Sequence, residues 1–338
     1  MLNLDFWNDI IIYGATVSLV SFFLVLVLTP RLIKLLIVKG QVVQDYHKSD
    51  RPSVPRPAGP AMAIGIGIAE IALYVLTGDV RVLAILLTSM IAFVIGLIDD
   101  KKVMPGWFKP VALIAAALPL IAMGAHDNYL NLIFGTAYIP LLYIPLIIII
   151  LPIVGNTINS IDVLNGAVSG FIIIASIPLL ISIALFADNV IFIAALPLVF
   201  VTLAFYKYHK YPSKIFPGDS GTLLLGALYG AIAIAGNSEI IGVIALLPAV
   251  MNSFLFLSSV KKVVEHRQVK SRPTVLTDDF KLAASSDRNA PVTLLRLILT
   301  GGPLPETKIV HQIFILAAFS SVLSFVSIIM QYFFQGLY

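Results

Sequence analysis

The sequence contains no cysteine and little charge, and both absences narrow what the chain can be. Without cysteine it has no disulfide, no thiolate metal site and no thiol nucleophile. Charged residues make up 12% of the chain, against about 25% in soluble proteins, whereas hydrophobic residues make up 59%. The N-terminal segment has two acids and no Lys or Arg, so we expect no secretory signal peptide. The composition indicates a polytopic membrane protein.

Apolar runs long enough to cross a bilayer, about 20 residues each, recur along the sequence. We expect an all-α polytopic membrane protein with about ten transmembrane helices in a single domain, 1–338. The expected spans are 10–36, 58–77, 81–98, 110–124, 138–154, 166–186, 190–206, 221–236, 239–260 and 309–335. Pro119 interrupts the short fourth span, Pro248 predicts a kink in the ninth, and a hairpin is expected around Gly135. Glycines that suit close helix packing include Gly65, Gly67, Gly226 and Gly230.

Basic residues gather on one side of this expected topology. All but one of the 22 Lys and Arg residues lie in or beside the loops after the first, third, seventh and ninth spans, and only Arg81 lies on the other side. The positive-inside rule makes these loops cytoplasmic and both termini extracytoplasmic. We therefore expect a multi-pass protein of the cell (plasma) membrane whose active loops face the cytoplasm.

Two adjacent carboxylates, Asp99 and Asp100, end the third span in the stretch GLIDDKK. Negative charge is unfavourable at a helix C-terminus because of the helix dipole. One interpretation is a solvated pair neutralised by Lys101 and Lys102. The other is a role in proton transfer or in binding a divalent cation, which prefers carboxylate oxygens.

The stretch VGNTINSIDVLNG carries three asparagines and an aspartate at steps of three residues: Asn156, Asn159, Asp162 and Asn165. If helical turns continue through this stretch, the four side chains stack along one face. A helix C-cap explains one asparagine but not the whole row. The row therefore favours a ligand site built from amide and carboxylate oxygens.

The stretch FPGDSGT, Phe216 to Thr222, enters the eighth span. Asp219 and Ser220 are ordinary N-cap residues, which is one interpretation of the stretch. The alternative is a site in which glycine backbone approaches a ligand closely and the helix N-terminus offers N–H groups to phosphate.

Two basic loops accompany these segments. The first is proline-rich and contains Lys48, so it is either a solvated loop facing lipid headgroups or a lid over an anionic substrate. The second, 261–308, is a long cytoplasmic loop with five basic residues and His266 between Lys261 and Arg272. A polybasic patch on the membrane surface explains this loop, as do arginines that bind a diphosphate.

In their order and spacing, GLIDD, GNTINSIDVLNG and FPGDSGT resemble the polyprenyl-phosphate N-acetylhexosamine-1-phosphate transferase superfamily, of the glycosyltransferase family 4 type. The chain is most similar to UDP-GlcNAc:dolichyl/polyprenyl-phosphate GlcNAc-1-phosphate transferases. The resemblance implies transfer of a sugar-1-phosphate from a UDP-sugar to a polyprenyl or dolichyl phosphate with release of UMP. Such a reaction is the first membrane step of N-glycan or cell-surface polysaccharide assembly. It also implies Mg²⁺ at the diphosphate, with Mn²⁺ as an alternative.

The resemblance also implies roles for individual residues. Asp99 and Asp100 are expected to be catalytic, one of them as a candidate base for the lipid phosphate. Asn159, Asp162 and Asp219 are expected to bind the metal. The residues expected to bind substrate are Lys48, Lys109, Asn156, Asn165, His266, Arg267 and Arg272.

Some positions match only part of the superfamily. Asn165 corresponds to the uracil-reading position, and His266 with Arg267 corresponds to a pair that contacts the diphosphate. The phospho-MurNAc-pentapeptide translocases have three successive histidines here, so the single histidine argues against that alternative. Val103 stands where the eukaryotic enzymes have Asn, and Asp162 where they have a small residue. This mixture is most similar to prokaryotic, archaeal enzymes of the GlcNAc-1-phosphate type.

A cation-coupled membrane transporter is the alternative from a different class. It would place several ionisable residues near the bilayer midplane, whereas only Glu70 lies well inside an expected span. For the transferase, the expected partners are the UDP-sugar donor, the polyprenyl or dolichyl phosphate acceptor and membrane lipids. No nucleic-acid partner is expected, and the sequence allows a homodimer without requiring one.

Overall fold

A computed structural model describes residues 4–260, 269 and 271–335 of the chain. The helices in this part are α1 Leu4–Val38, α2 Gly59–Thr77, α3 Val80–Lys101, α4 Phe108–Ala122, α5 Pro140–Ser160, α6 Ala167–Phe186, α7 Asn189–His209, α8 Gly218–Ala235, α9 Glu239–Ala245, α10 Leu247–Val260, α11 Leu294–Ile298 and α12 Glu306–Gln335. The strands form three antiparallel pairs: β1 Val42–Gln44 with β2 Ser53–Pro55, β3 Tyr129–Leu132 with β4 Gly135–Tyr138, and β5 Thr274–Leu276 with β6 Leu282–Ala284. A short 3₁₀ turn, Leu299–Gly301, follows α11.

The fold is an all-α polytopic membrane architecture, as the hydropathy predicts. In the described residues, eight helices are long and apolar enough to span a membrane, and the bent pair α9–α10 makes a ninth. That pair bends by 69° just before Pro248, where the kink is expected. The remaining expected span, the fourth, is α4, which has only 15 residues and is shorter than a bilayer crossing. The hairpin expected around Gly135 is the β3–β4 pair.

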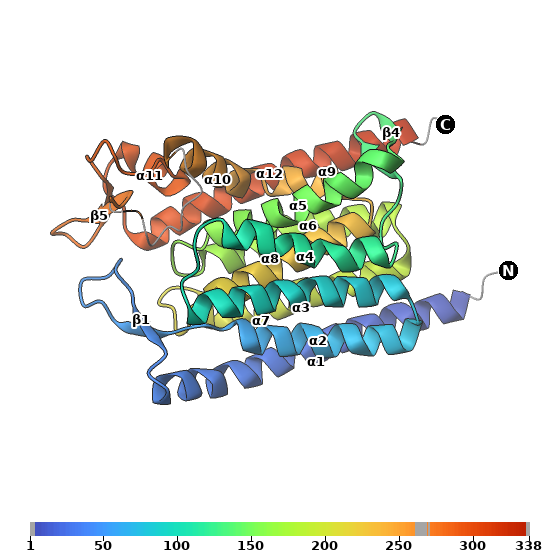
Figure 1. Cartoon of the computed structure of the whole chain (residues 1–338), viewed down its shortest axis with the longest axis horizontal. Helices are drawn as coiled ribbons and strands as arrows, with labels where there is room; N and C mark the ends of the chain where they lie inside the picture. Colours follow the sequence, from blue (N-terminus) through green and yellow to red (C-terminus); the bar gives the residue numbers. More distant parts are fainter. Residues whose placement is uncertain (1–3, 261–268, 270, 336–338) are drawn as a thin grey trace.

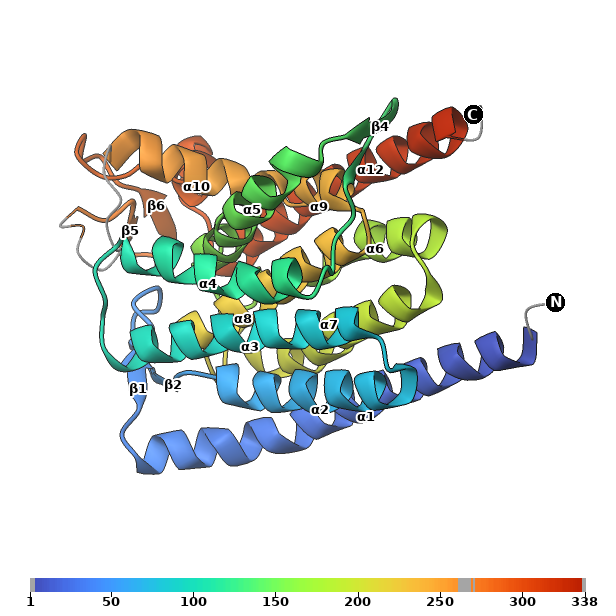
Figure 2. The ribbon, with the colours of Figure 1, turned by 45° about the vertical axis from the view of Figure 1, so that its right-hand side comes forward.

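The helices lie side by side, and their connections divide between two ends (Figure 1). Both termini and β3–β4 lie at one end, whereas β1–β2, β5–β6 and α11 lie at the other, here called the loop end. Figure 2 shows the same division after a turn of the molecule. The termini therefore lie on the same side of the bundle, as the sequence predicts.

Helix α8 is buried along its whole length, as expected for a helix that is apolar on every face. It packs against α3 and α5, and glycines allow the close approach. A methyl group at Gly96 of α3 would lie 2.4 Å from the Asp219 carbonyl oxygen, and one at Gly226 would lie 2.8 Å from the Cα of Gly155. Gly67, in contrast, faces open space, so the close packing expected there is absent. A close α3–α8 backbone contact therefore lies next to the acidic motifs of both helices.

Candidate active site

The second acid of the GLIDD motif caps a different helix from the one that carries it. At the end of α3, the Asp100 side chain accepts hydrogen bonds from the backbone N–H groups of Asp219 (2.9 Å) and Ser220 (2.8 Å). These N–H groups lie in the first turn of α8, where a carboxylate is favoured by the helix dipole and by free donors. The unfavourable position of Asp100 on its own helix is thus a favourable one for α8.

The first acid, Asp99, is fully buried and faces α4. It accepts a hydrogen bond from the Met104 backbone N–H at 2.8 Å, and the Lys109 ammonium lies 3.3 Å from its other oxygen. Lys109 is itself buried in the first turn of α4 and also donates to Asp219 Oδ1 at 2.9 Å. Lys109 therefore links the acids of α3 and α8, and Asp219 lies within the first turn of its helix rather than at the N-cap.

Arg56, directly after β2, completes this arrangement. Its Nη2 atom lies 3.0 Å from Asp100 Oδ1 and 2.5 Å from Asp219 Oδ2. Burial lowers the pKa of Arg56, but the charges of Asp219 and Asp100 outweigh it and raise the pKa above its usual value. Sequence reasoning counted Arg56 among the basic residues of a loop and missed it as a site residue. Its position between Pro55 and Pro57, in the same loop as Lys48, was the only available signal.

Asp162 lies in the turn after α5, near the same charges. Burial, together with the carboxylates of Asp219 and Asp100, raises the pKa of Asp162 to about 7 against the opposing effect of Arg56. Its Oδ1 atom lies 3.6 Å from Nε2 of His209, which the sequence did not single out. We call Arg56, Asp99, Asp100, Lys109, Asp162 and Asp219 the carboxylate cluster.

The four residues of the asparagine row do not share one face, because α5 ends at Ser160. Asn159 accepts a hydrogen bond from the Thr222 hydroxyl (2.7 Å) at the start of α8, which places it beside the carboxylate cluster. Asn156 donates back to the Pro152 carbonyl of its own helix. The prediction that all four side chains stack along one helix face is therefore wrong, since only Asn156 and Asn159 lie on α5.

Asn165 forms the centre of a second group at the loop end. Its Oδ1 accepts from Lys48 Nζ (3.0 Å) and from the Ser213 backbone N–H (2.7 Å), and its Nδ2 donates to Asp45 (3.1 Å). Its backbone N–H donates to Glu306 Oε1 at 2.7 Å. We call these five residues the Asn165 cluster. The amide that corresponds to the uracil-reading position is thus bonded to two loops, the one between β1 and β2 and the one between α7 and α8, and its role toward a base stays a prediction.

Arg272 lies beside the first basic loop, with its guanidinium 5.0 Å from the centre of the Tyr46 ring. Both residues line a cavity of about 360 Å³ that also includes His47, Val163 and Phe256. Burial lowers the pKa of His47. The charges of Arg272 and Lys48 lower this pKa further, whereas the Asp45 carboxylate raises it. The predicted pair His266 and Arg267 lies outside the described residues.

Comparison with known proteins finds a matching family model and several relatives. The model of glycosyl transferase family 4 matches residues 82–237, which include the acids of α3 and α8 and the asparagine row. A relative in Saccharolobus solfataricus bears the name of a UDP-N-acetylglucosamine–dolichyl-phosphate N-acetylglucosaminephosphotransferase; it is 29% identical over 93% of this chain and 95% of its own length.

Two bacterial relatives match over shorter lengths. One, named as an undecaprenyl-phosphate N-acetylglucosaminyl 1-phosphate transferase of Bacillus subtilis, is 30% identical over 64% of this chain and 62% of its own. A phospho-N-acetylmuramoyl-pentapeptide-transferase of Staphylococcus aureus is 27% identical over 68% of this chain and 78% of its own. Over residues 82–237 the chain is similar to glycosyl transferase family 4, and the relatives extend this similarity to most of its length.

Proposed function

We propose that this chain transfers GlcNAc-1-phosphate from UDP-GlcNAc to a polyprenyl or dolichyl phosphate and releases UMP. The observation that carries the proposal is the carboxylate cluster, in which three motif segments meet at one end of a membrane-spanning bundle. The activities named for the relatives in S. solfataricus and B. subtilis support both the donor and the acceptor. A soluble donor and a lipid acceptor can react only at such an interface.

The proposal includes Mg²⁺, with Mn²⁺ as an alternative. Asp219, Asp162 and Asn159 carry the carboxylate and amide oxygens that such hard cations prefer, and they would hold the ion. Within the described residues, no three acidic or histidine side chains converge into a preformed metal cage. This donor set fits Mg²⁺, which commonly completes its shell with waters and substrate phosphates. When bound, the ion would neutralise charge on the diphosphate.

The two cations of the cluster would bind the phosphates of the donor. Arg56 and Lys109 are each shared between two carboxylates, which fixes their positions. Phosphoryl transfer depends mainly on positioning and on neutralising charge, rather than on covalent chemistry by the protein. Fixed ammonium and guanidinium groups beside Asp219 are suited to both tasks.

The paired acids would act mainly by positioning. Both oxygens of Asp100 are bonded to the start of α8, and Asp99 is bonded to Lys109 and to backbone. A phosphate monoester is already largely ionised at pH 7, since its second pKa is about 6. The acceptor therefore has little need of a base, and we assign Asp100 the role of holding Asp219 in place.

We place the loop end on the cytoplasmic face of the cell membrane. The positive-inside rule supports this side, because the loop end carries the basic loops that contain Lys48 and Arg272. Nucleotide sugars would then reach the cluster from the compartment where they are made.

The experiment that tests the function is a turnover assay on the purified chain with UDP-GlcNAc, Mg²⁺ and polyprenyl phosphate. We expect a lipid-linked sugar diphosphate together with UMP, each identified by mass. Release of UDP instead of UMP would contradict phosphosugar transfer. A parallel reaction with UDP-MurNAc-pentapeptide tests the pentapeptide alternative. Faster turnover of that donor would make it, and not UDP-GlcNAc, the proposed substrate.

The residue test uses two aspartates at opposite ends of the bundle. Asp219→Asn is expected to lower turnover by more than about 100-fold, because it removes a charge that faces both Arg56 and Lys109 and the proposed metal. Asp188 caps α7 at the other end, and Asn caps helices equally well, so Asp188→Asn is the matched control. Comparable turnover in the two variants would remove Asp219 from the mechanism.

A further inference from the structure

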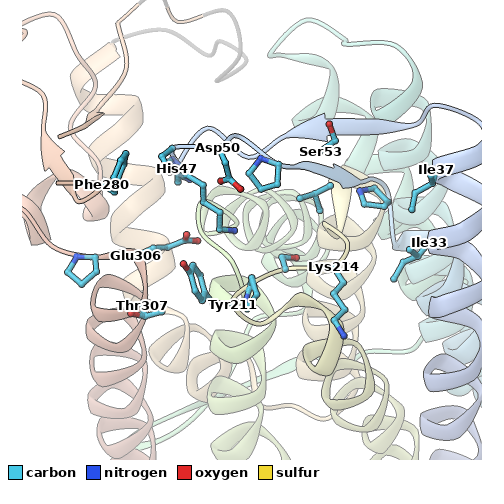
Figure 3. Close-up of a pocket in the computed structure, with 18 residues that line it drawn as sticks. Ile33, Ile37, His47, Asp50, Ser53, Tyr211, Lys214, Phe280, Glu306 and Thr307 are labelled. Carbon is cyan, nitrogen blue, oxygen red and sulfur yellow. The ribbon is translucent and has the colours of Figure 1, made fainter. Parts of the chain in front are cut away.

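A crevice of about 830 Å³ lies at the loop end, between α1 and α12. Figure 3 shows Ile33 and Ile37 of α1 on one side of it, and Glu306 and Phe280 on the other. Its remaining walls are the segments 47–50 and 52–55 and the segment 211–214. The crevice shares side chains with the Asn165 cluster, but within the described residues its lining includes no member of the carboxylate cluster.

The crevice straddles the boundary of the membrane-spanning region. Ile33 and Ile37 belong to the span Ile11–Val38, and Thr307 lies in the first turn of the span formed by α12. The residues between β1 and β2 lie outside any span and close the crevice on its polar side. A ligand that fills this space needs an apolar part and a polar part, which is the character of a membrane lipid with its headgroup.

Two features favour a phosphate in the polar part. The exposed Lys214 lines the crevice, and its side chain extends away from the β1–β2 hairpin and along the helices (Figure 3). The N-terminus of the 30-residue helix α12, at Glu306 and Thr307, forms another part of the wall. An ammonium group and a helix N-terminus both attract phosphate.

A third feature favours a hydrogen-bond donor next to that phosphate. Glu306 is buried, and its Oε1 atom accepts from the Asn165 backbone, but its Oε2 atom has no hydrogen-bond partner among the described residues. A buried acceptor without a partner is unfavourable, so an occupant that donates to it is stabilised. Asp50, exposed at the rim, offers a second acceptor.

We propose that this crevice binds a phospholipid of the surrounding membrane whose headgroup carries a hydroxyl or amine donor beside the phosphate. In this arrangement the phosphate lies against Lys214, the donor meets Glu306, and one chain follows the apolar face at Ile33 and Ile37. The bound lipid touches the Asn165 cluster through Glu306. None of the described residues that line the crevice belongs to the carboxylate cluster. We therefore assign the occupant as a resident lipid and not as the acceptor.

The test is native mass spectrometry of the purified full chain, titrated with phosphatidylglycerol, phosphatidylethanolamine or phosphatidylcholine. No nucleotide sugar is present, so the result is independent of the proposed transferase activity. Phosphatidylglycerol and phosphatidylethanolamine are expected to bind more tightly than phosphatidylcholine, whose quaternary ammonium has no N–H to donate. Equal binding of all three would overturn the role given to Glu306.

Variants locate the binding site. Lys214→Ala is expected to weaken phosphatidylglycerol binding about fivefold, which is the effect of removing one protein lysine that lies beside an anionic headgroup. Lys210→Ala, another exposed lysine that does not line the crevice, is the matched control and should leave binding unchanged. Ile37→Trp, at an exposed position on α1, should weaken binding by filling the crevice. Equal losses in the two lysine variants, or full binding by Ile37→Trp, would overturn the proposal, as would displacement of phosphatidylglycerol by polyprenyl phosphate.

Discussion

Replacing Asp100 tests whether this acid positions α8 or performs chemistry. Its two oxygens bond the backbone N–H groups of Asp219 and Ser220. Each buried N–H left without a partner costs about 1–3 kcal/mol, so Asp100→Ala should lower the free energy of unfolding by about 2–6 kcal/mol. Asp100→Asn keeps one acceptor oxygen but turns an amide N–H₂ toward the other N–H, so about half of that loss is expected.

The assay is thermal unfolding in detergent, followed by circular dichroism. A change of 1 kcal/mol moves Tm by about 2 °C in a chain of this size, so Asp100→Ala should unfold about 4–12 °C lower. Asp279→Asn, at an exposed position in a loop, is the matched control and should change stability by less than about 0.5 kcal/mol. An Asp100→Asn variant with unchanged Tm and no turnover would refute the positioning role and make Asp100 a catalytic residue.

The remaining predictions concern packing and pH. Gly96→Ala places a methyl 2.4 Å from the Asp219 carbonyl oxygen and should cost about 1–3 kcal/mol and most of the turnover, whereas Gly67→Ala, facing open space, should not destabilise the fold; equal Tm values would contradict this. Burial raises the pKa of Asp45, but the Lys48 ammonium and other hydrogen bonds lower it below its usual value. Asp45 therefore stabilises the fold above its unfolded pKa of about 3.9, and this stabilisation disappears as pH falls through the lower folded value. The Tm deficit of Asp45→Asn should accordingly shrink below about pH 4, and a deficit that is independent of pH would contradict the assignment.

Hydropathy predicted most of the fold because a bilayer requires long, apolar, internally hydrogen-bonded segments. Each expected span coincides with a helix or with the pair α9–α10, and the bend of that pair lies beside Pro248. The failures are local. The helical stack of Asn156, Asn159, Asp162 and Asn165 does not form, because the chain leaves the helix after Ser160, and sequence periodicity does not specify where a helix ends.

The candidate site was predicted in its residue types but not in its connections. The acids at the ends of α3 and α8 were visible as motifs, whereas Arg56 was hidden within a basic, proline-rich loop. Its ion pair with Asp219 joins residues 163 positions apart in the chain. Local patterns contain no information about such a pair, because the pair exists only when β2 and α8 meet.

The sequence by itself determined that this is a helical membrane protein whose basic and acidic motifs gather on one side. Those properties follow from composition and from the cost of placing charge in a bilayer. Only the tertiary structure decided what the motifs do. The acid that opposes the dipole of α3 satisfies the N-terminus of α8, because glycine at position 96 lets the two backbones approach closely. Packing between distant segments, rather than local preference, therefore decided the role of Asp100.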